Sequence, residues 1–238
     1  LVFGKLLNGG QLCLSPDYVL VPEELEEQLI ARVVSETQSM YPNITENTDY
    51  AGVFDERHFA RLQGYIDDAV AKGAKLTIVG ADKTRASEGN RRMPLHILQN
   101  VTEDMQVMHE EIFGPLLPVM TYADITEVPN KIEPRRNPLA LYYFGKDKSE
   151  QEYLLSHVPS GGVCINDITL HYVQEDLPFG GVGASGMGAY HGPEGFRNMS
   201  HARAIYSQTM IDILPIIGAR PPFGDKFRKN IGKILGAI

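Results

Sequence analysis

The sequence predicts an α/β fold with a doubly wound, mostly parallel sheet. Apolar runs such as Lys75 to Val79 and Leu116 to Tyr122 alternate with segments whose apolar residues recur every three or four positions. This alternation is typical of βαβ units, in which helices cover both faces of a parallel sheet. At 238 residues the chain is also long enough to bury one large core.

The expected strands are short apolar runs distributed along the chain. In order they are Tyr18 to Val21, Lys75 to Val79, Leu95 to Val101, Leu116 to Tyr122, Leu139 to Gly145 and Gly162 to Asn166. Such runs suit strands that are buried on both faces of a sheet.

A helix is expected from Glu23 to Met40. Within it Leu25, Leu29 and Val33 recur every four positions, and Pro22 stands where it suits helix entry. The glutamates at its beginning are favoured there, because the helix dipole attracts negative charge to the N-terminus.

A second helix is expected before the strand at Lys75. Its apolar positions are Phe59, Leu62, Ile66 and Val70. Gly73 is expected to end it, because glycine tolerates left-handed backbone geometry.

Beyond Asn166 the alternation stops, and glycine dominates up to Gly195, which predicts a long functional loop. Residues 202–208 are expected to form one further strand. An amphipathic helix follows, with apolar residues at Phe223, Phe227, Ile231, Ile234 and Leu235 and lysines at Lys226, Lys229 and Lys233. The sequence therefore predicts an α/β domain over residues 1–195 and a strand and tail over 196–238.

Composition narrows the function classes. Acidic residues outnumber basic ones by 30 to 22, which disfavours a nucleic-acid-binding role. Two cysteines make no disulfide framework, and with no visible signal peptide or long apolar span a reducing, cytoplasmic setting is expected. The seven histidines show no zinc-ligand spacing, so no metal site is expected.

The segment Gly9-Gly10-Gln11-Leu12-Cys13 is the leading candidate for chemistry. Glycines let backbone and substrate approach closely, and a cysteine in such a turn can attack a carbonyl while its own N–H holds the oxyanion. The alternative is that Cys13 is a small buried apolar residue without a chemical role.

Two further motifs follow this segment in order, Met108 to Leu116 and Leu177 to Gly188. Together the three resemble motifs of the aldehyde dehydrogenase superfamily, and the resemblance spans the C-terminal, catalytic half of that family. Ser185 to Gly192 resembles the class 3 branch, and Pro138 to Gly145 resembles its bacterial coniferyl aldehyde dehydrogenase members. The resemblance implies that the half carrying most of the dinucleotide-binding fold is absent from this chain.

The resemblance also implies roles for individual residues. Cys13 would be the catalytic nucleophile, and the coenzyme would be NAD or NADP. Its nicotinamide ribose would be bound by Glu111, its nicotinamide would pack near Phe113, and His58 and Arg61 would flank the same ribose. Phe179 would line the substrate tunnel.

Some expected parts have no counterpart here. The family's general-base glutamate and oxyanion-hole asparagine match no residue of this chain, so the isolated chain is expected to be inactive. The run Gly181 to Gly186 fits a G-x-G-x-x-G pattern, but its flanks lack the strand and helix of a dinucleotide fingerprint.

Several alternatives stay open. The substrate could be an aromatic aldehyde, as in the coniferyl branch, or an aliphatic one; coenzyme A could replace water; or the chain could be a non-catalytic contact module. The family implies a homodimer that pairs through the late strand. The tail could dock on its own or a neighbouring subunit, or lie on a membrane surface.

Overall fold

The computed structural model describes residues 1–80, 90–135 and 137–236. The chain divides into two compact units, Leu1–Met199 and Ser200–Ile238, each of which is described by itself. The boundary expected at residue 195 falls inside helix α7 (Gly192–Asn198), which closes the first unit.

The first unit contains the predicted strands in two sheets. They are β1 (Val19–Pro22), β2 (Lys75–Val79), β3 (Leu95–Gln99), β4 (Leu116–Tyr122), β5 (Ala140–Tyr143) and β6 (Gly162–Ile165). The larger sheet has the order β1-β4-β3-β2, and β5 pairs with β6 in a second sheet. The pairs β1–β4, β3–β4 and β5–β6 are parallel, whereas β2–β3 is antiparallel. The α/β fold with a mostly parallel sheet is thus confirmed, with one antiparallel strand at its edge.

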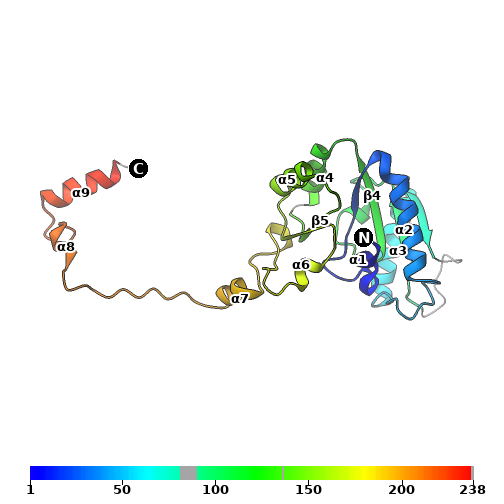
Figure 1. The fold of residues 1–238 in the computed structure, drawn as a ribbon, viewed down its shortest axis with the longest axis horizontal. Coiled ribbons are helices and arrows are strands. Elements are labelled where there is room, and N and C mark those ends of the chain that lie inside the picture. Colours follow the sequence, from blue (N-terminus) through cyan, green and yellow to red (C-terminus); the bar gives the residue numbers. More distant parts are fainter. Residues whose placement is uncertain (81–89, 136, 237–238) are drawn as a thin grey trace. The chain divides into compact units, whose positions relative to one another are not determined.

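Helices cover both faces of the larger sheet: α1 (Val2–Leu6) and α2 (Glu26–Met40) pack on one face and α3 (Glu56–Ala71) on the other (Figure 1). The first unit also contains α4 (Val128–Ile132), α5 (Lys148–His157), α6 (Leu170–Val173) and α7. Alternate strand residues face opposite helices, since Ile97 packs with the α1 and α2 side chains while Leu98 packs with α3. This two-sided burial is the doubly wound arrangement that the sequence predicts.

The predicted end of the second helix is confirmed. Gly73 has φ +99°, its N–H donates to the Val70 carbonyl, and the Ala74 N–H donates to the Ala69 carbonyl. These two bonds form a Schellman motif, which needs a residue that tolerates left-handed geometry. At the other end, the Asp55 side chain accepts from the His58 N–H and caps α3. The helix is thereby held at both ends beside the segment that precedes β4.

The first predicted helix differs slightly from expectation. Glu23–Leu25 form a 3₁₀ turn, and α2 begins at Glu26. The glutamates still occupy the first turns, where negative charge is favoured.

The second unit contains α8 (Ile213–Ile216) and α9 (Asp225–Leu235). The strand expected over residues 202–208 is not found: this segment belongs to none of the ladders formed by the described residues. A strand is maintained by main-chain pairing, and in this single chain the segment has no strand beside it. Within the described ranges no helix is long and apolar enough to cross a membrane.

Candidate active site

The turn that carries Cys13 begins with three consecutive residues of left-handed backbone geometry. Asn8, Gly9 and Gly10 have φ values of 52°, 65° and 76°. A Cβ on Gly10 would lie 2.5 Å from the Gly114 carbonyl oxygen, and a Cβ on Gly9 would lie 2.9 Å from the Ala51 carbonyl oxygen. The glycines therefore permit the close backbone approach that the sequence predicts, and this approach brings together the first two motifs.

Gln11 anchors the same turn to a distant loop. Its amide nitrogen donates to the Asn8 carbonyl at 2.9 Å and to the Gly52 carbonyl at 3.1 Å, and its amide oxygen accepts from the Phe54 N–H at 2.8 Å. Cys13 follows in a four-residue turn closed by the Ser15 N–H donating to the Leu12 carbonyl.

Cys13 is exposed, with a free thiol. Its N–H donates no hydrogen bond to any other residue of the described chain. An accessible sulfur beside an unused donor is the pair that attack on a carbonyl requires. Cys164 is different, because it is 9% exposed on β6 and belongs to the core.

Lys5 holds the chain just after the thiol. Its ammonium donates to the Pro16 carbonyl at 2.8 Å, and its side chain is fully buried. Burial lowers the pKa of Lys5 to about 8, against the opposing effect of the Asp17 carboxylate. The sequence analysis missed this lysine, and a lone basic residue among the apolar residues of Val2–Leu6 is the available signal.

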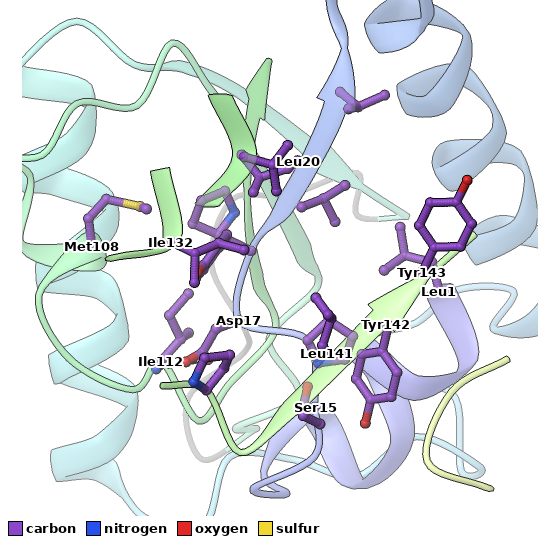
Figure 2. Close-up of a pocket in the computed structure, with 18 of the residues that line it drawn as sticks. Leu1, Ser15, Asp17, Leu20, Met108, Ile112, Ile132, Leu141, Tyr142 and Tyr143 are labelled. Atoms are coloured by element: carbon purple, nitrogen blue, oxygen red, sulfur yellow. Dashed lines mark hydrogen bonds between the residues drawn. The ribbon is translucent and has the colours of Figure 1, made fainter. Parts of the chain in front are cut away.

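Asp17 links the thiol segment to the second motif. Its Oδ1 accepts from the Ile112 N–H at 3.1 Å, and Figure 2 shows the two residues on the same wall of a cavity. Burial raises the pKa of Asp17, although Lys5, the Ile112 N–H and Arg61 favour the ionised form. Sequence reasoning also missed Asp17, because its partner is 95 residues away.

Arg61 reaches the same segment from α3. It donates to the Ile112 carbonyl at 2.7 Å and to the Glu111 carbonyl at 3.4 Å. The guanidinium also lies 5.1 Å from the centre of the Tyr65 ring. Together, Asp17 and Arg61 hold both sides of Ile112.

Glu111 and Phe113 flank the buried Ile112, and both are exposed. Partial burial and the Asp17 charge raise the pKa of Glu111, while Arg61 lowers it. No hydrogen bond within the described residues engages the Glu111 carboxylate. Phe113 has φ +48°, a strained geometry for a bulky residue that is typical of functional segments. An available carboxylate beside an exposed ring fits the hydroxyls and the flat base of a nucleoside.

The neighbouring polar side chains have other partners. Glu110 accepts from the Tyr65 hydroxyl at 3.3 Å. The His58 ring lies 2.7 Å from Asp55 through its Nδ1. His58 lies on the same helix as Arg61, but no hydrogen bond between the described residues joins it to the Glu111 segment.

An open cavity of about 1330 Å³ lies between β1 and β5. Cys13, Asp17, Glu111, Tyr142 and Ser185 all line it. Figure 2 shows Tyr142 and Tyr143 projecting from opposite sides of β5. The cavity therefore connects the thiol turn with the Glu111 segment, which the sequence could only predict as separate motifs.

Phe179 lies elsewhere, in a cluster of aromatic rings. It is 9% exposed, is absent from the described lining of the cavity, and pairs by two 2.8 Å main-chain hydrogen bonds with Tyr190. Its ring lies 4.9 Å from that of Tyr172, 5.6 Å from that of Tyr190 and 6.1 Å from that of His191. Tyr172 and Tyr190 keep 42% and 45% of their surface exposed.

The Cys13 charge acts on one ring of this cluster. Desolvation raises the pKa of Tyr190, and Tyr172 and the Cys13 charge add to the shift. The glycine-rich run beside it forms a 3₁₀ turn over Gly183–Ser185. Among the described residues no group of His, Cys, Asp and Glu side chains is arranged to hold a metal ion.

The chain is similar to a known protein family and to several known proteins. The model of the aldehyde dehydrogenase family matches residues 1–205. A probable coniferyl aldehyde dehydrogenase of Caulobacter vibrioides is 45% identical over 229 residues, covering 96% of this chain and 47% of the relative. Aldehyde dehydrogenase family 3 member A2 of Mus musculus is 39% identical, covering 85% of this chain and 40% of the relative.

A solved structure shows the same fold. The substrate-bound AldH of Staphylococcus aureus superimposes with a TM-score of 0.81 at 34% identity, covering 98% of this chain and 49% of that protein. The chain thus spans about half the length of the relatives it matches.

Proposed function

Because the chain belongs to the aldehyde dehydrogenase family, we propose that it supplies the nucleophile of an NAD(P)-dependent enzyme that oxidises an aldehyde to its carboxylic acid. The observation that carries this proposal is the exposed Cys13 thiol beside its own unused N–H, in a turn held against the Glu111 segment. The family resemblance inferred from the three motifs agrees with these comparisons.

Cys13 carries the covalent chemistry. Its thiolate adds to the aldehyde carbon, and the carbonyl oxygen becomes an oxyanion that the Cys13 N–H stabilises. Loss of a hydride from the former aldehyde carbon then leaves a thioester. Water attacks the thioester, which releases the acid and restores the thiol.

The coenzyme would be held by four residues, Glu111, Phe113, Arg61 and His58. When bound, the nicotinamide ring supplies the acceptor for the hydride. Glu111 would accept hydrogen bonds from ribose hydroxyls, since its carboxylate is available and partly desolvated. Phe113 would present its exposed ring to the base, and Arg61 would keep the segment in place through Ile112.

The preferred substrate would be an aromatic aldehyde of the coniferyl type. Tyr172, Phe179 and Tyr190 form a surface of rings, one of which, Tyr190, interacts electrostatically with Cys13, and planar rings stack favourably on such a surface. The similarity to a probable coniferyl aldehyde dehydrogenase supports the same class. In this proposal the two partly exposed tyrosines contact the substrate. Phe179, which is buried, packs against them and holds them in place.

The second unit would serve in homodimer formation. Its Ile205, Tyr206 and Met210 side chains are 77% exposed or more, which is typical of surfaces that meet a partner. Pairing of residues 202–208 with a second copy would complete the strand that the single chain lacks. Light scattering on the complete protein, with and without residues 200–238, measures this: equal masses would exclude the role.

The function is tested by NADH and NADPH formation in the complete protein, with coniferyl aldehyde and an aliphatic aldehyde as substrates. Cys13→Ser should abolish turnover with both. Cys164→Ser is the matched control, because it removes the other thiol from a core strand and should leave chemistry intact. Turnover that survives in Cys13→Ser would refute the proposal, and dependence on coenzyme A would indicate an acylating enzyme.

The isolated chain should not sustain turnover, since it spans about half the length of its relatives. Purified residues 1–238 should give no continuing NADH production under conditions in which the complete protein is active. Steady production would contradict this part of the proposal.

A further inference from the structure

We propose that Tyr142 is a positioning residue for the Cys13 turn, through a hydrogen bond from its hydroxyl to the Leu14 carbonyl. This inference rests on the proposed role of Cys13. The bond is 2.9 Å long and joins residues 128 apart in the sequence. It connects the thiol turn to β5, in a different sheet from the neighbouring β1.

The position of this bond within the turn gives it its importance. Cys13 and Leu14 are the two central residues of the turn that the Ser15 N–H closes on the Leu12 carbonyl. The Leu14 carbonyl belongs to the same planar peptide unit as the Ser15 N–H, so Tyr142 and the closing bond hold that unit from its two sides. The Leu12 carbonyl that accepts the closing bond shares its peptide unit with the Cys13 N–H, so holding the Leu14–Ser15 unit in place also restricts the direction of the Cys13 N–H.

Two other side chains hold the chain before and after the Cys13 turn. Gln11 fixes the chain before the thiol, and Lys5 fixes the Pro16 carbonyl after it. Tyr142 is the side chain found to bond a main-chain atom of Cys13 or Leu14 within the described residues. Loss of its hydroxyl would leave the fold anchored and the turn held by its closing bond alone.

The surroundings of Tyr142 suit a fixed donor. Its ring packs against His171, with 6.0 Å between ring centres, and His171 is buried with both ring nitrogens lacking a partner in the described chain. Burial raises the pKa of Tyr142 and outweighs the lowering effect of a hydrogen bond with the Thr169 main chain, while Cys164 and Cys13 add smaller increases. The hydroxyl therefore keeps its proton, and with it the ability to donate, over the pH range in which a thiolate forms.

A matched control stands next to it on the same strand. The Tyr143 hydroxyl donates to Glu150 at 2.7 Å, on α5, and its side chain projects from the other side of β5 (Figure 2). Tyr143→Phe thus removes an equivalent hydrogen bond without touching the thiol turn. Tyr142→Phe removes the bond to Leu14 and keeps the ring against His171.

The experiment compares Tyr142→Phe, Tyr143→Phe and Cys13→Ser in the complete protein. The single-turnover rate of coenzyme reduction should fall about 10-fold in Tyr142→Phe, the size expected for one lost hydrogen bond that orients reacting groups. The dissociation constant for coenzyme should stay unchanged, because the Glu111 segment is held by Asp17 and Arg61. Tyr143→Phe should keep the full single-turnover rate.

The outcomes separate this inference from the proposed function. An inactive Cys13→Ser with equal single-turnover rates in the two tyrosine variants would overturn the role of Tyr142 alone. That role would also be overturned if Tyr142→Phe weakened coenzyme binding as much as it slowed reduction, since a loss of both would indicate a general structural defect. Activity surviving in Cys13→Ser would overturn both the proposed function and this inference.

Discussion

Substituting Gly10 by alanine should both destabilise the protein and displace the thiol turn. Gly10 has φ +76°, and a left-handed geometry costs a residue with a Cβ about 1–2 kcal/mol. The new Cβ would also lie 2.5 Å from the Gly114 oxygen, 2.7 Å from its carbonyl carbon and 3.0 Å from the Lys5 oxygen. These are backbone atoms that cannot move as a flexible side chain can, and overpacking of this kind costs about 1–3 kcal/mol. The free energy of unfolding should fall by roughly 2–5 kcal/mol.

Urea denaturation of the complete protein measures this loss, and Gly64→Ala is the matched control. Gly64 lies within α3, and a Cβ there would meet no atom within 4 Å. That variant should be more stable by about 0.5–1 kcal/mol, because alanine favours the helix. A Gly10→Ala protein that stays within about 1 kcal/mol of the unmodified one, with the full rate of Cys13 alkylation, would refute the reasoning.

Three further predictions concern the buried Lys5, the core residue Leu62 and the Glu111 segment. Because burial holds the pKa of Lys5 near 8 in the folded protein, against 10.5 ordinarily, its ammonium costs stability below pH 8. The unmodified protein should therefore gain roughly 2–3 kcal/mol relative to Lys5→Met between pH 8 and 10.5, and a constant difference in urea denaturation would contradict this. Leu62→Ala should lower the free energy of unfolding by about 2–5 kcal/mol, because its side chain is 0% exposed, whereas Leu155→Ala at a site that is 49% exposed should change it by less than about 0.5 kcal/mol. Glu111→Gln should weaken coenzyme binding about 10-fold in a fluorescence titration, and a slower thiol alkylation with unchanged binding would contradict its assignment.

The larger elements of the fold could be predicted because their signals are local. The run Lys75 to Val79 and the run Leu116 to Tyr122 became strands with those same ends. Gly73 ended its helix because the Schellman motif depends on residues within a few positions. The strand expected over 202–208 fails for the opposite reason, since pairing is a non-local property that a single chain does not supply.

In the candidate site, too, residues that lie in local motifs could be predicted, whereas residues whose partners are distant in the sequence could not. Cys13, Glu111 and Phe113 could be proposed from the sequence because each lies in a motif of adjacent residues, and the structure brings these motifs together through Gly10 and Gly114. The side chains that hold these motifs together, such as Asp17, lie in no recognisable motif. The partner of Asp17 lies 95 residues away, and nothing near that aspartate marks which N–H it will accept.

Tyr142 shows why such contacts are beyond a reading of the sequence. The strand carries two consecutive tyrosines, and composition gives no reason to prefer one of them as the partner of the thiol turn. Which tyrosine faces the thiol turn is decided by the register of β5. A shift of one residue in its pairing with β6 would exchange the faces of Tyr142 and Tyr143. The observed register pairs Tyr142 with Cys164 and directs the Tyr143 hydroxyl to Glu150 on α5. The hydrogen bond that reaches the thiol turn thus depends on the register of a strand more than 120 residues away along the chain.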